Sequence, residues 1–127
     1  MKRVTAAIIE KDNKILITQR AKEDKLSLKW EFPGGKIEEG ETPEACLKRE
    51  IIEELNLEIE VREFFGKSIY KYETGEICLL AYKACILSGD MKLNVHQDAK
   101  WVTISELKDY DFAPADVELL RIMDATK

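Results

Sequence analysis

Four glutamates lie close together in the sequence, one in a glycine-containing loop and three in the segment that follows it. Glu41 comes first, and Glu50, Glu53 and Glu54 follow at helical spacing. On a helix of about 100° per residue, the last three carboxylates share one sector about 100° wide. Carboxylate oxygens suit Mg²⁺ or Mn²⁺, with water and substrate phosphates completing the coordination shell. The pattern favours a metal site, and the alternative is an ordinary solvated acidic face.

The crowding of charge on this segment is unfavourable by itself. The pairs Glu50–Glu53 and Glu50–Glu54 each destabilise a helix by a few tenths of a kcal/mol. Arg49 can partner Glu53 at i+4, but Glu50 and Glu54 have no basic residue at helical spacing on their C-terminal side. A divalent cation among the carboxylates would remove this repulsion.

A glycine pair and a lysine precede the glutamates. Gly34 and Gly35 allow close approach of the backbone, and Lys36 places a positive charge beside it. We expect the loop 35–41 to return toward the helix and bring Glu41 near the other three carboxylates. A glycine-containing loop, a lysine and clustered carboxylates predict a site for metal-bound phosphates.

Two helices are expected, and the acidic one has the clearer boundaries. Thr42 can cap a helix over 42–55, Pro43 suits its first position, and Glu44 complements the positive end of the helix dipole. The second helix is expected over 114–123. We predict that its inner face is formed by Val117, Leu120 and Met123.

Strands are predicted from apolar runs and alternation. The expected strands are 4–10, 14–20, 28–32, 58–72, 76–87 and 99–103. The first two form a hairpin around Asp12-Asn13, and the fourth and fifth are joined around Thr74-Gly75. Strands that occur singly and as hairpins around two helices predict an α/β or α+β sandwich with a mixed sheet.

Length and composition set the frame for this site. The chain has 127 residues, which suits one domain over 1–127. A net charge of −5 argues against long nucleic acid as the main partner, and no apolar run reaches the length of a membrane span. The three cysteines are odd in number and form no C-x-x-C pair, so we expect a cytoplasmic protein with reduced thiols. A monomer and a homodimer both remain open.

The spacing of the chemical residues follows a known pattern. Gly35, Glu41 and the run Arg49–Leu57 match the Nudix box G-x5-E-x7-R-E-U-x-E-E-x-G-U, where U is aliphatic. The one departure is Asn56 in place of glycine, and asparagine tolerates the left-handed conformation that a helix end often needs. The chain therefore resembles the Nudix hydrolase family. Segments 28–36 and 112–116 resemble its MutT subgroup, which contains 8-oxo-dGTP diphosphatases and CTP pyrophosphohydrolases.

The resemblance implies a fold and a chemistry. It implies an α/β/α sandwich with a mixed sheet, and Mg²⁺-dependent hydrolysis of a nucleoside triphosphate to the monophosphate and pyrophosphate, by attack of water at the β-phosphorus. Mn²⁺ can substitute. Arg49 would orient the carboxylates, and Glu41 would support the loop or the metal shell. The implied metal ligands are the Gly35 carbonyl and the carboxylates of Glu50, Glu53 and Glu54.

Substrate contacts are expected outside the box as well. Arg20 and Lys36 are candidates for the phosphates, although Arg20 could instead be a solvated strand end. Phe32 could pack against the base or belong to the core. Asp116 could accept hydrogen bonds from guanine or from the cytosine amino group, or serve as a first-turn acid of the second helix.

The general base and the exact nucleotide are less sharply defined. Many members of the resembled family have a glutamate in the loop before the last short strand, where this chain has Val95. Candidates to replace it are Glu53, which is the first choice, Glu54, Asp98 and His96. The favoured substrate is 8-oxo-dGTP, with CTP or 5-hydroxy-dCTP as the alternative. A non-catalytic nucleotide-binding module is the interpretation from another class.

Overall fold

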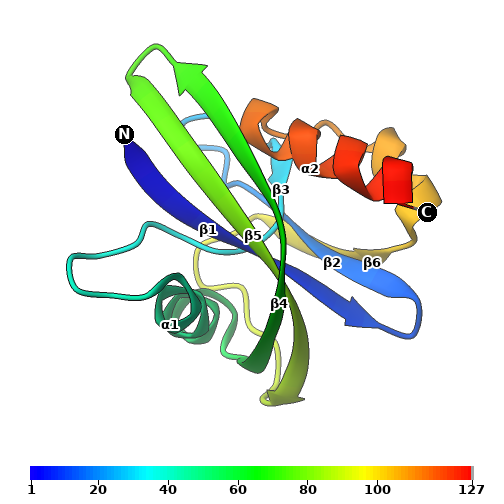
Figure 1. Cartoon of the computed structure of the whole chain (residues 1–127). Coiled ribbons are helices and arrows are strands. Elements are labelled where there is room, and N and C mark those ends of the chain that lie inside the picture. The colour runs from blue at the N-terminus through cyan, green and yellow to red at the C-terminus, as the bar shows by residue number, and fades with distance from the viewer. Residues whose placement is uncertain (127) are drawn as a thin grey trace.

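The computed structural model describes residues 1–126, which form six strands, two α-helices and one 3₁₀ helix (Figure 1). The strands are β1 (Lys2–Lys11), β2 (Lys14–Gln19), β3 (Trp30–Glu31), β4 (Glu58–Tyr72), β5 (Gly75–Ser88) and β6 (Asp98–Val102). The helices are α1 (Pro43–Leu55), η1 (Ile104–Asp109) and α2 (Pro114–Thr126). All of the expected elements are present. The strand expected over 28–32 is shorter, because Leu28 has a φ of 61° and is not extended.

The strands form one mixed sheet between the two α-helices. The order is β3-β2-β1-β5-β4, with β6 paired to β2, and β1 runs parallel to β5 while the other pairs are antiparallel. Alternate residues of β1 face opposite sides. Ala6 belongs to the apolar core that contains Leu119 of α2, whereas Ala7 belongs to the core that contains Leu47 of α1. Figure 1 shows the helices on opposite sides of the sheet, so the α/β/α sandwich is confirmed.

The centre of the sheet is opened by the divergence of β1 and β2. These strands pair only beside their turn; farther along, β2 pairs with β3, and β1 takes up segment 33–37 as its neighbour. The Gly35 carbonyl accepts from the Thr5 amide at 2.8 Å. Gly34 permits this approach, because a Cβ there would lie 2.0 Å from the Thr5 carbonyl oxygen. The segment from β3 to Lys36 is therefore fixed in the middle of the molecule.

Helix α1 begins and ends as its sequence predicts. The Thr42 hydroxyl accepts from the Ala45 amide at 3.1 Å, and Pro43 is the first helical residue. Asn56 ends the helix with φ 58° and ψ 33°, the left-handed conformation in which glycine is usual. The core-facing residues are Cys46, Leu47, Ile51 and Leu55.

Helix α2 faces the sheet with two of the three residues that its sequence indicates, because Met123 is buried and Leu120 packs against the core. Val117 is 50% exposed, so its predicted place on the inner face is wrong, and Leu119 is buried instead. The reason lies in β4, where a Cβ on Gly66 would meet the end of Ile122 at 2.9 Å. This close crossing sets the rotation of α2. No helix within residues 1–126 is long and apolar enough to span a membrane.

Candidate active site

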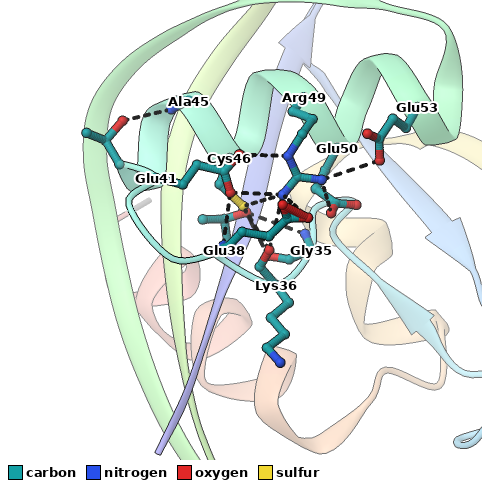
Figure 2. A network of polar contacts seen from close by, with 11 residues as sticks. Gly35, Lys36, Glu38, Glu41, Ala45, Cys46, Arg49, Glu50 and Glu53 are labelled. Atoms are coloured by element: carbon teal, nitrogen blue, oxygen red, sulfur yellow. Dashed lines mark hydrogen bonds and ion pairs between the residues drawn. The ribbon is translucent and has the colours of Figure 1, made fainter.

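Arg49 connects three of the four clustered glutamates (Figure 2). Its Nε and Nη2 donate to the two carboxylate oxygens of Glu41 at 2.7 and 2.9 Å, a bidentate pair. Its Nη1 donates to Glu50 at 2.8 Å and reaches Glu53 at 3.4 Å. The hydrogen bond from Arg49 is the main reason that the pKa of Glu41 falls to about 2. Arg49 therefore organises the carboxylates and compensates much of their charge.

The loop before α1 returns to the helix as expected. The Glu41 side chain accepts from the Glu38 amide at 3.0 Å, and Arg49 Nη2 donates to the Lys36 carbonyl at 3.3 Å. Glu41 thus ties the loop to Arg49, as Figure 2 shows. Its carboxylate oxygens are used in these contacts, which makes it a support of the loop.

The absence of a side chain at Gly35 leaves room for the side chain of Glu50. A Cβ at this position would lie 2.2 Å from the Glu50 carboxyl carbon, so only glycine lets that side chain lie against the loop. The Gly35 carbonyl, expected among the metal ligands, is engaged by the Thr5 amide at 2.8 Å and the Thr5 hydroxyl at 3.1 Å. The buried Cys46 thiol lies 3.5 Å from the same oxygen. The structure thus directs this carbonyl toward β1 and gives Gly35 a steric role.

Glu54 is the most perturbed of the clustered glutamates. Burial is the largest cause that raises its pKa, to about 8, and the nearby charges of Glu50 and Glu31 raise it further while Arg20 opposes them. Its Oε1 is buried and has no hydrogen-bond partner among the residues that the structure describes. A buried acceptor without a partner is costly. The negative charges of Glu50 and Glu31 thus lie near Glu54, whose buried Oε1 has no hydrogen-bond donor among the described residues.

These features bear on whether the residues fit a divalent cation. Within residues 1–126, no three His, Cys, Asp or Glu side chains are already arranged to hold a metal ion. The unpartnered oxygen of Glu54 and the adjacent Glu50, which Arg49 pairs through Oε1, are nevertheless hard carboxylate donors, and both line the same cavity. Glu53 is different, because its side chain is 57% exposed, against 15% for Glu50. Two of the three expected glutamate ligands therefore converge, and the donor set fits a hard cation completed by phosphates and water.

One cavity of about 630 Å³ joins this acidic cluster to an apolar chamber. Its volume lies in the range of ligand sites in proteins. Its charged lining residues include Arg20, Glu31, Lys36, Glu50 and Glu54. Its apolar and aromatic lining residues include Phe32, Tyr72, Leu79 and Ala113, and the buried Asp116 also lines it. The predicted substrate-binding residues Arg20, Phe32, Lys36 and Asp116 are thus all brought to one cavity.

The apolar end contains a buried carboxyl group. Asp116 is 6% exposed, and one of its oxygens accepts from the Phe32 amide at 3.0 Å. Burial, the largest cause, raises the pKa of Asp116 well above its usual value, and Glu31 adds to the effect. Phe32 is 3% exposed and packs on Phe112 with ring centroids 5.4 Å apart. Phe32 therefore serves the core and the cavity wall together.

Two cavity residues were not predicted from the sequence as site residues. Glu31 pairs with Arg20 at 3.0 Å and lies 3.5 Å from His96. Tyr72 comes from the β4–β5 hairpin, and its hydroxyl accepts from the Ala115 amide at 3.0 Å. The sequence could have indicated Glu31 as a site residue, because it lies next to Phe32 and close to the glycine pair. Tyr72 had none, because only the tertiary fold brings that hairpin to the cavity.

The position of each candidate general base favours Glu54. Of the four candidates in the described part of the chain, Glu54 alone lines the cavity. Glu53, the first choice from sequence, faces solvent, and Asp98 accepts a hydrogen bond from the Ala99 amide at 2.7 Å. Val95 is exposed, and the His96 side chain is buried behind Glu31.

This fold and this arrangement of carboxylates are those of a known family. The NUDIX domain profile matches residues 1–122, so the chain belongs to the NUDIX family. It is 38% identical over 125 residues to the CTP pyrophosphohydrolase of Escherichia coli K12, covering 98% of this chain and 92% of that protein. It is 35% identical over 109 residues to the 8-oxo-dGTP diphosphatase of the same organism, covering 86% and 84%.

Solved structures agree with this assignment. The solution structure of the E. coli ORF135 protein superposes with a TM-score of 0.86 at 36% identity, covering 98% of this chain and 89% of that one. The NMR structure of the DNA mismatch repair protein MutT from methicillin-resistant Staphylococcus aureus 252 has a TM-score of 0.76 at 38% identity, covering 98% and 96%. The expected Nudix fold is confirmed.

Proposed function

We propose that the protein is a divalent-metal-dependent pyrophosphohydrolase that converts a nucleoside triphosphate to the monophosphate and pyrophosphate. The observation that carries this proposal is that one cavity is lined both by the carboxylates of Glu50 and Glu54 and by Phe32 and Asp116. A nucleotide has the matching construction, with anionic phosphates at one end and a flat base at the other. The names of the two E. coli relatives, both nucleotide hydrolases, support it.

The acidic end would hold the metal. Glu50 and Glu54 would be its central ligands, Glu53 would join from the rim, and Gly35 leaves room for Glu50. Mg²⁺, or Mn²⁺ in its place, would offset phosphate charge and make a bound water more acidic. Arg49 keeps Glu50 in place, and the basic side chains of Arg20 and Lys36 bind phosphate oxygens.

Glu54 is also the proposed acceptor of the proton from the attacking water. Among the four candidate bases Glu54 alone lines the cavity, so it alone lies beside the space that the phosphates and the attacking water would occupy. Transfer of that proton to Glu54 leaves hydroxide character on the nucleophile, which attacks the β-phosphorus. The bond between the β-phosphorus and the oxygen that bridges it to the α-phosphorus breaks, and this oxygen leaves with the monophosphate. The products are the monophosphate and pyrophosphate.

The apolar end would select the base. Phe32 lines the wall, and burial raises the pKa of Asp116, which favours the neutral carboxyl form beside it. One of its oxygens accepts from the Phe32 amide, so the other can donate to the base as well as accept from it. We favour 8-oxo-dGTP as substrate. The second candidate, CTP or 5-hydroxy-dCTP, is supported by the 38% identity to the CTP pyrophosphohydrolase.

A nucleotide panel tests the proposal. The purified chain is incubated with Mg²⁺ and 8-oxo-dGTP, dGTP, CTP or 5-hydroxy-dCTP, and products are separated by ion-exchange chromatography. We expect monophosphate and pyrophosphate in equal amounts, and Glu54→Gln should lower kcat on the order of 10²-fold or more. Release of orthophosphate would contradict the proposed bond cleavage. Tight binding by calorimetry without any product would favour a non-catalytic module.

A further inference from the structure

The single histidine of the chain is buried directly behind the cavity. The His96 side chain is 4% exposed, and its Nε2 lies 3.5 Å from Oε2 of Glu31. Its Nδ1 is buried and has no hydrogen-bond partner among the described residues. A polar ring kept in this environment costs stability. The contact of Nε2 with Glu31 therefore explains the buried position of His96 better than packing does.

The loop that carries His96 is fixed at both ends. The side-chain amide of Asn94 donates to the Glu53 carbonyl at 2.9 Å, and the Asn94 backbone amide donates to the Glu54 carbonyl at 3.1 Å. On the other side, the Gln97 amide donates to the Gln19 carbonyl at 2.9 Å. The histidine is thus held between the C-terminal end of α1 and the end of β2.

Glu31 connects His96 to Arg20, which lines the cavity. Its other oxygen, Oε1, accepts from Arg20 Nη1 at 3.0 Å, and Arg20 Nε donates to the Lys25 carbonyl at 2.8 Å. Arg20, Lys25 and Glu31 all line the cavity. The guanidinium is therefore fixed on two sides, by the carboxylate that faces the histidine and by the loop that forms the cavity wall.

We propose that His96 is a positioning residue, which fixes the Glu31 carboxylate and through it the orientation in which Arg20 binds the nucleotide. This inference rests on the proposed function. A misoriented Arg20 weakens binding of substrate and transition state alike, so it raises KM and leaves kcat nearly unchanged. A purely structural role gives the opposite result, because fewer folded molecules lower kcat at constant KM.

Two substitutions separate these roles. His96→Leu fills the buried space without an Nε2, whereas His96→Gln returns an amide that can donate to Glu31. We expect His96→Leu to raise KM about tenfold with kcat changed less than twofold and with undiminished resistance to urea, and His96→Gln to restore most of the affinity. The matched control is Asp111→Asn, which breaks the exposed Lys29–Asp111 ion pair at 2.6 Å next to β3 and should leave the kinetics unchanged.

A double-variant comparison tests whether His96 acts through Glu31. If His96 acts through Glu31, His96→Leu has no further effect in a Glu31→Gln background. Multiplying effects, or wild-type KM in His96→Leu, would overturn the proposal. A fall in kcat at constant KM, together with lower stability, would also overturn it.

A spectroscopic measurement does not depend on turnover. Because the chain has one histidine, its imidazole ¹⁵N signals come from one ring. We expect a protonated Nε2 and an unprotonated Nδ1, with signals that shift in Glu31→Gln but not in Asp111→Asn. Unchanged signals in Glu31→Gln would refute the contact. If the wild-type chain hydrolyses no triphosphate, the proposed function fails by itself, and nucleotide affinity from calorimetry then takes the place of KM.

Discussion

The carboxyl group of Asp116, at the start of α2, accepts a hydrogen bond of 3.0 Å from the backbone amide of Phe32, although 84 positions separate the two residues. This bond joins the second helix to the segment that leads into the glycine pair. It also holds in the cavity lining a carboxyl group whose pKa is raised by burial. The hydrogen bonds that Asp116 can offer to a base therefore depend on whether its carboxyl group is protonated.

Replacing Asp116 tests that protonation directly. Asn keeps an acceptor for the Phe32 amide and a donor for the base, so it imitates the neutral acid. We expect kcat/KM of Asp116→Asn to stay within about threefold of wild type, whereas Asp116→Ala loses roughly tenfold or more because the Phe32 amide is left unpaired. Steady-state kinetics with the preferred nucleotide decide this. Equal losses in both variants would show that the ionised form is the functional one.

The pH dependence of stability gives a second test at the same residue. The folded-state pKa of Asp116 is raised by burial, so the fold favours its neutral form. Its favourable contribution is complete below the usual carboxyl pKa of 3.8 and is lost as pH rises toward the folded value. Urea unfolding of wild type and Asp116→Asn should therefore diverge with rising pH, with the variant gaining relative stability. A constant difference from pH 4 to 9 would contradict this expectation.

The contribution of Glu41 to stability should depend on pH in the opposite direction to that of Asp116. Its pairing with Arg49 lowers the folded pKa from 4.5 to about 2, so its contribution to stability is present above 4.5 and is lost as pH falls toward 2. We expect Glu41→Gln to have a lower urea midpoint than wild type at pH 7, and this difference to shrink between pH 4.5 and 2. Glu39→Gln is the matched control, because Glu39 is an exposed carboxylate in the same loop. Equal behaviour of the two variants would refute the role of the Arg49 pair.

Gly35→Ala should disturb the acidic cluster without removing a carboxylate. The new methyl group would lie 2.2 Å from the carboxyl carbon of Glu50, so that side chain must move. A displacement of about 1 Å can cost on the order of 10²-fold in rate. We expect a loss of this size together with weaker Mn²⁺ binding by electron paramagnetic resonance and an unchanged circular dichroism spectrum. Unchanged Mn²⁺ affinity would show that Glu50 does not bind the metal.

Divalent ions should stabilise the fold through Glu54. A ligand at 100 times its Kd stabilises the folded state by about 2.7 kcal/mol if it does not bind the unfolded chain. We expect Mg²⁺ to raise the urea midpoint of wild type and to do so much less in Glu54→Gln. Addition of EDTA reverses the effect. Sodium chloride at equal ionic strength controls for screening, and the same shift in both proteins would place the ion elsewhere.

The parts of the fold that local chemistry determines were predictable. Thr42 and Asn56 mark the two ends of α1 by capping rules that need no tertiary context. The rotation of α2 was not predictable, since it depends on the contact of Ile122 with Gly66 from a distant strand. Val117 consequently lies on the exposed face.

The candidate site shows the same division. The glycine and glutamate spacing identified Gly35, Glu50 and Glu54, because neighbours in sequence form that cluster. The outward position of Glu53 depends on its contact with Arg49 and on solvent, which helical spacing does not reveal. The contact between Glu31 and His96 joins segments that only the folded sheet brings together.

The parallel pairing of β1 with β5 begins at Lys2 and Ile77, so the first strand of the chain needs a strand from its second half as its neighbour. Synthesis on the ribosome releases the whole carboxylate helix long before β5 exists. A nascent chain that ends at Leu57 thus contains every residue of the Nudix box and still lacks β5, which pairs with β1, and the cavity residue Tyr72. The lining of the cavity is therefore complete only after β5 and the start of α2 have been synthesised.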